Sequence, residues 1–217
     1  MTAPPRSDAA PRITAVVFDL GGVLIDWDPR YLYRKLLAEE EIEPFLAEIG
    51  FFAWNHAQDS GGSWDDAVEE LAAQHPHRRD LIAAFPDRFP ETLGGPIQET
   101  VTLLDELHRS GTTRLLALTN WSSGTFPVAR TTFDFLDRFE GIVVSGEERV
   151  AKPDPALFAI LLDRYGLVPQ ETVFIDDAAA NVVAAQQLGL IALRFTSPGE
   201  LRADLSRLGL LDGAGSG

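Results

Sequence analysis

The sequence predicts an α/β protein built on a doubly wound parallel sheet, with an all-helical domain inserted after the first strand. Short apolar runs alternate with amphipathic helical patterns along much of the chain, as expected for strands joined by helices. Residues 13–18 are apolar at nearly every position, which is typical of a strand covered on both faces. Asp19 and Thr119, which each end an apolar run, lie 100 positions apart. A strand–helix–strand unit takes ~30 or more residues, so this gap must hold an insertion.

Composition and charge restrict the class of protein. The chain has 217 residues, of which 45% are hydrophobic, enough for one domain that carries an insertion. It has no cysteine, which excludes disulfides, thiolate metal sites and cysteine nucleophiles. The net charge is −15 and no basic patch is visible, so we expect no nucleic-acid partner. No run reaches the ~20 apolar residues that span a membrane. Residues 1–12 lack the apolar core of a secretory signal, so we expect a cytoplasmic protein without a membrane partner.

The first half of the chain supplies one strand and then helices. After a disordered leader at residues 1–12, we expect the strand at 13–18. Helical patterns follow at 31–37, 43–49, 63–73 and 78–85. Ser63 and Asp66 precede one of them in the manner of a capping box. This all-helical domain is placed at 29–93, with hinges near 21–29 and 94–96.

The second half returns to alternating strands and helices. Strands are expected at 114–118, 141–145, 172–175 and 190–195. Helices are expected at 97–108, within 126–139, and at 155–165, 178–188 and 198–208. Gly111 and Gly166 mark helix ends, and Asp154 is a candidate N-cap. The sheet domain therefore covers 13–28 and 94–210, followed by a disordered tail at 211–217.

Polar side chains follow the strands of the predicted sheet, where ligands of such sheets bind. They are Asp19, the pair Thr119-Asn120, Lys152, and the pair Asp176-Asp177. Each feature alone is typical of a turn or a helix cap, but their repetition at successive strand ends favours an active site. A carboxylate such as Asp19 can attack phosphorus or carbon. Neighbouring carboxylates repel each other unless a cation lies among them, and Mg²⁺ suits oxygen ligands. A threonine and a lysine can stabilise a transferring phosphoryl group.

In these motifs the chain resembles the haloacid dehalogenase-like (HAD) hydrolases, from residue 13 to about 208. FDLGGVL is similar to the first family motif, LTN to the second, AKPDP to the third and FIDDAAAN to the fourth. The resemblance implies a Rossmann-like core with a helical cap, and Asp19, Thr119 and Lys152 as catalytic residues. It also implies Mg²⁺ as cofactor, held by Asp19, the carbonyl of Gly21, Asp176 and Asp177. Asp177 is the better match to the side-chain ligand, and Asn181 lies where some members carry a second acidic residue.

Gly21 departs from the family pattern. Phosphatases of the family usually carry there a second aspartate, which protonates the leaving group and then activates water. Losing a general acid–base costs ~10²–10⁴ in rate. Asp26 and Asp28 could replace it or simply form a polar hinge. The departure keeps two alternatives open, a metal-independent 2-haloacid dehalogenase and a non-catalytic HAD scaffold that binds a phosphorylated ligand. The dehalogenases replace the acidic pair of the fourth motif by neutral residues, so the intact pair here favours a phosphatase.

The resemblance and the motifs together predict a Mg²⁺-dependent hydrolase of small phosphate monoesters that forms an aspartyl-phosphate. The partner would be a small phosphorylated metabolite, and the protein a monomer or homodimer. Within the inserted domain, Trp54, Asn55, His56 and residues 59–62 form a polar, aromatic stretch that could face the cleft. Trp27 and Trp64 are interpreted as packing residues. The predicted substrate-binding residues are Gly22, Asn120, Trp121, Trp54 and His56.

Overall fold

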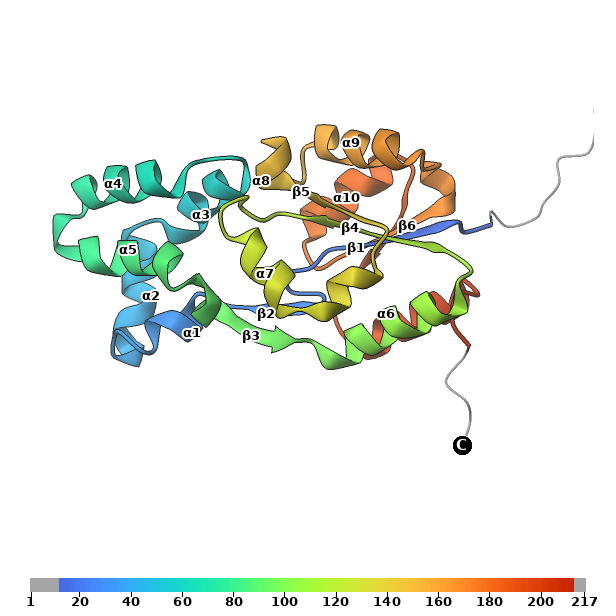
Figure 1. The fold of residues 1–217 in the computed structure, drawn as a ribbon, viewed down its shortest axis with the longest axis horizontal. Coiled ribbons are helices and arrows are strands. Elements are labelled where there is room, and N and C mark those ends of the chain that lie inside the picture. The colour runs from blue at the N-terminus through green and yellow to red at the C-terminus, as the bar shows by residue number, and fades with distance from the viewer. Residues whose placement is uncertain (1–11, 213–217) are drawn as a thin grey trace, which may run out of the picture.

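The structure, a computed structural model, describes residues 12–212 of the chain. The leader and tail that the sequence predicts to be disordered lie outside the described residues, except at 12, 211 and 212. Helices cover both faces of a central sheet, and a group of helices lies beyond one end of it (Figure 1). Within residues 12–212, no helix is long and apolar enough to cross a membrane.

The central sheet has five parallel strands in the order β5-β4-β1-β6-β7. The strands are β1 (Ala15–Phe18), β4 (Arg114–Thr119), β5 (Gly141–Val144), β6 (Thr172–Asp176) and β7 (Ile191–Arg194). The chain moves outward from β1 to β4 and β5, and later returns to place β6 and β7 on the other side. β1 therefore lies where the strand order reverses, which is where ligands bind in such sheets. The predicted doubly wound parallel sheet is confirmed.

The two faces of β1 pack into different hydrophobic clusters. Val16 and Phe18 join the cluster under α6 (Gln98–Ser110) and α11 (Pro198–Arg207), whereas Ala15 and Val17 face α9 (Pro155–Tyr165) and α10 (Ala179–Gln187). All four strand residues are fully buried, which explains why β1 is apolar at every position. The remaining helices of this part are α7 (Phe126–Thr132), η3 (Asp134–Arg138), α8 (Ser145–Glu148), α9 (Pro155–Tyr165), η4 (Pro169–Glu171) and α10 (Ala179–Gln187).

Residues 30–92, named here the helical segment, contain helices and no strand, as predicted. Its elements are α1 (Arg30–Tyr33), α2 (Glu39–Glu48), α3 (Phe51–Asp59), α4 (Trp64–Gln74), η1 (Pro76–Arg78), α5 (Arg79–Asp87) and η2 (Phe89–Thr92). Ser63 caps α4 by accepting a hydrogen bond from the Asp66 N–H, as the sequence pattern indicates. The helix predicted at 31–37 is too long, since α1 is a single turn. Helix α3 was not predicted, because its apolar first half is followed by a polar second half.

Two short strands at the base of the helical segment were also missed. β2 (Ile25–Trp27) and β3 (Leu93–Pro96) pair antiparallel, so the two connections to the sheet run side by side (Figure 1). The sequence Leu-Gly-Gly-Pro is unfavourable for a strand, which is why only a hinge was expected. The structure supplies a reason for Gly94, since a Cβ there would lie 2.3 Å from Asp26 Oδ2. The missing side chain lets β2 and β3 approach each other.

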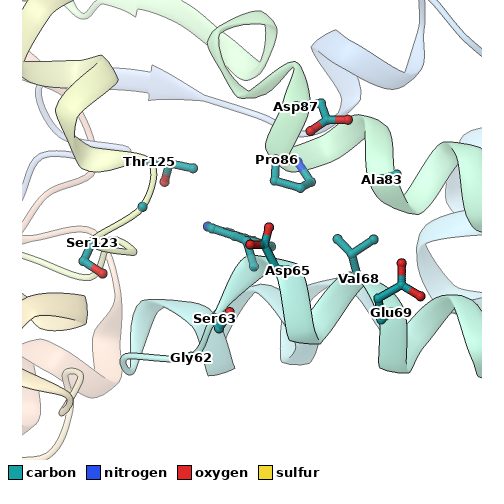
Figure 2. Close-up of a pocket in the computed structure, with 12 residues that line it drawn as sticks. Gly62, Ser63, Asp65, Val68, Glu69, Ala83, Pro86, Asp87, Ser123 and Thr125 are labelled. Atoms are coloured by element: carbon teal, nitrogen blue, oxygen red, sulfur yellow. The ribbon is translucent and has the colours of Figure 1, made fainter.

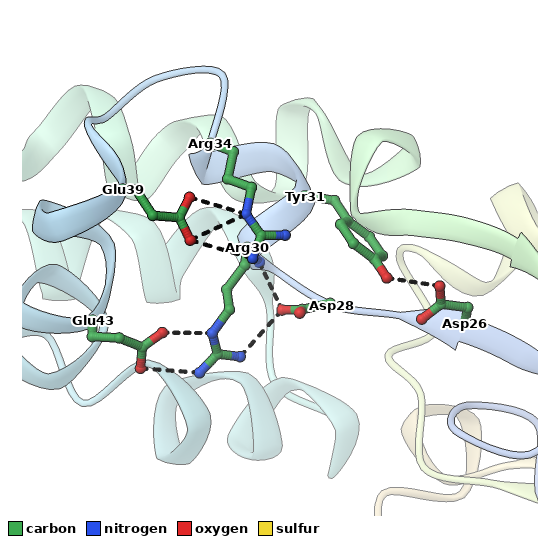
Figure 3. A network of polar contacts seen from close by, with 7 residues as sticks. All are labelled: Asp26, Asp28, Arg30, Tyr31, Arg34, Glu39 and Glu43. Atoms are coloured by element: carbon green, nitrogen blue, oxygen red, sulfur yellow. Dashed lines mark hydrogen bonds and ion pairs between the residues drawn. The ribbon is translucent and has the colours of Figure 1, made fainter. Parts of the chain in front are cut away.

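Polar contacts join this ribbon to the first helices (Figure 3). The Tyr31 hydroxyl donates to Asp26 Oδ2 at 2.7 Å. Asp28 Oδ1 accepts a hydrogen bond from the Arg30 N–H at 2.9 Å and pairs with the Arg30 guanidinium at 3.2 Å. Glu43 binds the same guanidinium from α2. Both aspartates therefore have partners within the hinge.

Aromatic rings form the core of the helical segment. Phe85 is fully buried, and its ring lies 4.8–5.9 Å from those of Phe51, Trp54, Trp64 and Phe89. Four aromatic neighbours in edge or tilted contact contribute beyond the area that they bury. The segment thus has a hydrophobic centre of its own.

We predict that Phe85→Ala lowers the free energy of unfolding by ~3–5 kcal/mol, because it empties the centre of this cluster. Phe52→Ala is the matched control, since Phe52 is 53% exposed on the neighbouring helix α3, and its effect should stay within about 0.5 kcal/mol. Urea unfolding followed by tryptophan fluorescence measures both. Equal effects of the two substitutions would contradict the packing described here.

Candidate active site

Asp19 lies at the carboxyl end of β1 and is only 8% exposed. Its backbone N–H extends the sheet by donating to the carbonyl of Ile175, which fixes the direction of the side chain. Its carboxylate is held from two sides. Oδ1 accepts the N–H of Leu20 at 2.7 Å, and Oδ2 lies 2.9 Å from Lys152 Nζ. Asp19 is thus a buried, oriented carboxylate at the edge where the sheet binds ligands.

The Lys152 ammonium is buried among three acceptors, which matches its three N–H donors. Nζ lies 2.9 Å from Asp19 Oδ2, 2.7 Å from Asp176 Oδ2 and 2.8 Å from the carbonyl of Leu118. Burial opposes the charged form, but the carboxylates of Asp19 and Asp176 outweigh it and raise the pKa of Lys152. The ammonium therefore stays charged at the centre of the site.

Asn120 holds the main chain of Lys152. Its Nδ2 donates to the Lys152 carbonyl at 2.9 Å, and its Oδ1 accepts the Lys152 N–H at 2.8 Å. These two contacts make Asn120 a positioning residue for Lys152, and its predicted contact with substrate stays a prediction. The neighbouring Thr119 differs, because its buried Oγ1 has no hydrogen-bond partner among the described residues. A buried hydroxyl without a partner is unfavourable unless a ligand satisfies it.

Asp19, Asp176 and Asp177 form an acidic cluster in which ligand oxygens lie within 4.8 Å of one another. Burial, reinforced by the charges of Asp176 and Asp177, raises the pKa of Asp19 to about 8, although Lys152 opposes the shift. Burial and Asp176 also raise the pKa of Asp177. One ammonium cannot neutralise three carboxylates, so the cluster fits a further hard cation such as Mg²⁺.

The two members of the Asp-Asp pair have different surroundings. Asp176 is fully buried and accepts hydrogen bonds from Lys152, from the Ala178 N–H at 2.8 Å and from Asn181 Nδ2 at 3.0 Å. Its oxygens are therefore already occupied. Asp177 is exposed at the same edge. This difference makes Asp177 the better placed of the two to offer an oxygen to a metal ion.

The two glycines after the nucleophile serve different purposes. Gly22 has a φ of +74°, and a Cβ there would lie 2.5 Å from Asp177 Oδ2. Its N–H donates to the Ile25 carbonyl at 2.9 Å. Gly22, expected to bind substrate, thus turns the chain closely past Asp177 and has no amide left for a ligand. At Gly21 the space is open, since a Cβ would meet nothing within 4 Å.

A small cavity of about 70 Å³ joins the site to the helical segment. It is lined by Gly21, Trp27, Asn55, Asp59, Phe89, Asn120, Trp121 and Thr125. A larger hollow of about 660 Å³ lies between α4, α5 and residues 123–125 (Figure 2). Its wall carries Asp65, Glu69 and Asp87 but none of the strand-end residues. Of these two hollows, the small cavity is the one lined by Gly21 and Asn120, which lie close in sequence to Asp19 and Thr119, so it is the candidate substrate pocket.

The structure separates the aromatic and polar residues that the sequence singled out. Trp121 lines the small cavity. Trp54 lies in the aromatic core of the helical segment and donates to the Ala67 carbonyl at 3.2 Å, and His56 is exposed and lines neither cavity. Trp27, interpreted as packing, also lines the small cavity. The sequence indicated the stretch around Trp54, but not which of its residues would face the pocket.

Comparison with known proteins agrees with this geometry. A profile of haloacid dehalogenase-like hydrolases matches residues 13–189. The sesquiterpene phosphatase astK of Aspergillus oryzae is 29% identical over 188 residues, covering 84% of this chain and 89% of the relative. Hexitol phosphatase A of Escherichia coli is 26% identical over 213 residues, covering 93% and 89%. A HAD family enzyme of Bacteroides thetaiotaomicron superposes with a TM-score of 0.70 at 24% identity, covering 90% and 99%. That enzyme has also been solved with magnesium and inorganic phosphate.

The chain therefore belongs to the haloacid dehalogenase-like hydrolases, as its motifs suggest. The observed strand order and the convergence of the four motifs on one sheet edge are consistent with this membership.

The raised pKa of Asp19 predicts that Mg²⁺ binding depends on pH. Below about pH 8 a proton on Asp19 competes with the metal, so affinity should fall up to about tenfold per pH unit. The folding stability of the metal-free protein should change with pH in the opposite direction. The folded pKa of about 8 exceeds the ordinary 3.8, so the folded state keeps a proton that the unfolded state loses. The free energy of unfolding of the metal-free protein should then decrease as the pH rises from 3.8 to about 8. Calorimetric titration with Mg²⁺ across the window tests the first effect, and an affinity independent of pH would contradict it.

Proposed function

We propose that this protein is a Mg²⁺-dependent phosphatase that hydrolyses small phosphate monoesters through an aspartyl-phosphate on Asp19. The observation that carries the proposal is the pairing of buried Asp19 with Lys152 at 2.9 Å, beside the Thr119 hydroxyl, which has no hydrogen-bond partner within residues 12–212. A nucleophile, a positive charge and a free donor are what phosphoryl transfer requires. The phosphatase relatives, and the related enzyme solved with magnesium and phosphate, support the same activity.

Each residue at the strand ends has a role in this reaction. The Leu20 N–H and Lys152 hold the Asp19 carboxylate in one orientation, so that it can attack phosphorus. Lys152 and Thr119 stabilise the oxygens of the transferring phosphoryl group. Mg²⁺ held by Asp19, the Gly21 carbonyl and Asp177, with Asp176 close by, would supply the positive charge that brings the anionic substrate and carboxylate together. Water then releases phosphate from Asp19.

We further propose that the helical segment acts as a cap over this site, within the domain bounds of residues 29–93. Trp64 Nε1 donates to Ser122 Oγ at 2.8 Å, and Ser145 Oγ donates to the Asp59 carbonyl at 2.5 Å. The contacts join the segment to residues that follow β4 and β5 at the carboxyl edge of the sheet. A closed cap would exclude bulk water while the aspartyl-phosphate exists.

The walls of the small cavity indicate the kind of leaving group. Trp27, Phe89 and Trp121 give it aromatic sides, and no lysine or arginine in the described part of the chain lines it. We infer a small metabolite whose alcohol part carries no second strong negative charge.

Three further properties remain predictions from the sequence. They are a cytoplasmic location, the lack of a nucleic-acid or membrane partner, and a monomeric or homodimeric state.

We predict that wild-type protein hydrolyses para-nitrophenyl phosphate with Mg²⁺ and that EDTA abolishes turnover. Asp19→Asn should lower kcat by more than ~10³-fold because it removes the nucleophile. Asp177→Ala should lower activity by weakening metal binding. Asp65→Asn, which neutralises a carboxylate of the larger hollow, is the matched control and should leave activity unchanged.

Two outcomes would contradict the proposal. Dehalogenation of 2-chloropropionate in EDTA, retained by Asp177→Ala, would indicate the metal-independent dehalogenase. Tight phosphate binding without turnover of any ester would indicate a scaffold that binds phosphorylated ligands, in which Gly21 marks a loss of catalysis.

A further inference from the structure

Position 21 lacks the carboxyl group that would protonate a leaving alcohol. Apart from the nucleophile Asp19, the aspartates nearest to it in sequence are Asp26 and Asp28, and both are engaged in the hinge. Asp26 accepts from Tyr31, and Asp28 is paired with Arg30 (Figure 3). Neither lines the small cavity. Hydrolysis of an alkyl phosphate therefore needs an acid from another part of the chain.

Asp59 is the one ionisable side chain among the described residues that line this cavity. It is the last residue of α3 and lines the cavity from the helical segment, whereas Gly21 lines it from the loop that follows β1. Asn55 Nδ2 donates to its Oδ2 at 2.9 Å, and its main-chain carbonyl is fixed by Ser145. The carboxyl group is therefore held in one orientation at the wall of the cavity.

We propose that Asp59 is the general acid–base of this enzyme. From its position in the helical segment, it would replace the carboxyl group that is missing at Gly21. The assignment rests on the proposed phosphatase function and adds to it the residue that handles the proton. It also makes the helical segment part of the catalytic machinery, since the acid reaches the pocket only when the segment lies against the sheet.

The surroundings of Asp59 suit this role. Burial raises its pKa to about 7, although hydrogen bonds from the Ser122 main chain and from Asn55 oppose the shift. No charged side chain contributes to the shift, and the other residues that line the cavity are uncharged. A carboxyl group with a pKa near neutrality can both give and accept a proton under working conditions.

Asp59 gives up one proton and regains one over the two steps of the reaction. In the first step an Asp19 oxygen bonds to phosphorus and the ester P–O bond breaks, while the leaving oxygen takes the proton of Asp59 and departs as an alcohol. In the second step the Asp59 carboxylate takes a proton from water. The water oxygen bonds to phosphorus and the bond to Asp19 breaks. Phosphate leaves, and Asp19 and Asp59 return to their starting states.

Asp59→Asn tests the proposal, because it keeps the shape and hydrogen-bonding oxygen but cannot transfer the proton. With ethyl phosphate, whose alkoxide needs protonation, kcat should fall by ~10²–10⁴. With para-nitrophenyl phosphate, whose leaving group needs little help, the first step should survive. Rapid mixing should then show a burst of about one nitrophenolate per active site. Slow turnover should follow, because the variant lacks the carboxylate that activates water to hydrolyse the aspartyl-phosphate.

A rescue variant and two controls accompany this test. Gly21→Asp in the Asp59→Asn background places a carboxyl group in open space, and should restore ethyl phosphate turnover at least tenfold. Asp65→Asn should behave as wild type with both esters. Thermal melting should show that Asp59→Asn is folded.

The outcomes separate the two proposals. No Mg²⁺-dependent turnover by the wild type would overturn the phosphatase function and this assignment together. An active wild type with unchanged Asp59→Asn kinetics would overturn only the assignment. Equal losses on both esters without a burst would show a structural role for Asp59, and failure of Gly21→Asp to recover activity would also count against a proton-transfer role.

Discussion

The site depends on one buried ammonium. Lys152 Nζ lies within 3 Å of Asp19, Asp176 and the Leu118 carbonyl, which come from β1, β6 and β4. Removing these charges from water is costly, and the cost is recovered only when each donor has a partner. Asn120 holds the lysine main chain, and Asn181 holds Asp176, so the pairing cannot shift without breaking several hydrogen bonds. The charge arrangement is therefore fixed before any substrate arrives.

The position of β1 makes this arrangement available. β1 pairs with β4 on one side and β6 on the other, so residues that follow three separate strands meet at one edge. The same pairing leaves more negative than positive charge there, and burial, reinforced by the charges of Asp176 and Asp177, raises the pKa of Asp19. A metal ion would relieve that excess, and a phosphoryl group would satisfy the hydroxyl of Thr119. The excess charge and the partnerless hydroxyl both arise from the fold.

The sequence predicted the sheet and its polar edge well, because buried parallel strands are continuous apolar runs and their ends are marked by charged residues. Helices with clear caps, such as Pro155–Tyr165 between Asp154 and Gly166, were also predicted accurately. The ribbon of β2 and β3 was missed, since its stability comes from a close approach at Gly94 rather than from strand-forming residues. The hydrogen bonds of Asn120 and Gly22 were not predicted, because periodicity shows where a residue lies along the chain and not which hydrogen bonds it makes.

Residues of the helical segment were hardest to assign for a related reason. Trp54 and Asp59 lie on one helix, five positions apart, and yet one joins the aromatic core and the other lines the pocket. That difference depends on how α3 packs against α4 and against the loops of the sheet, which are distant in sequence. Exposure of His56 follows from the same packing.

The most direct test of the account is whether Asp19 accepts a phosphoryl-like group. Fluorine NMR of the protein with beryllium fluoride would show signals of an aspartyl-bound trifluoroberyllate. We expect these signals in the wild type only when Mg²⁺ is present, and no such signals from Asp19→Asn. Equal signals from Asp19→Asn, or none from a folded, Mg²⁺-loaded wild type, would contradict the claim that Asp19 is the nucleophile of a metal-assisted phosphoryl transfer.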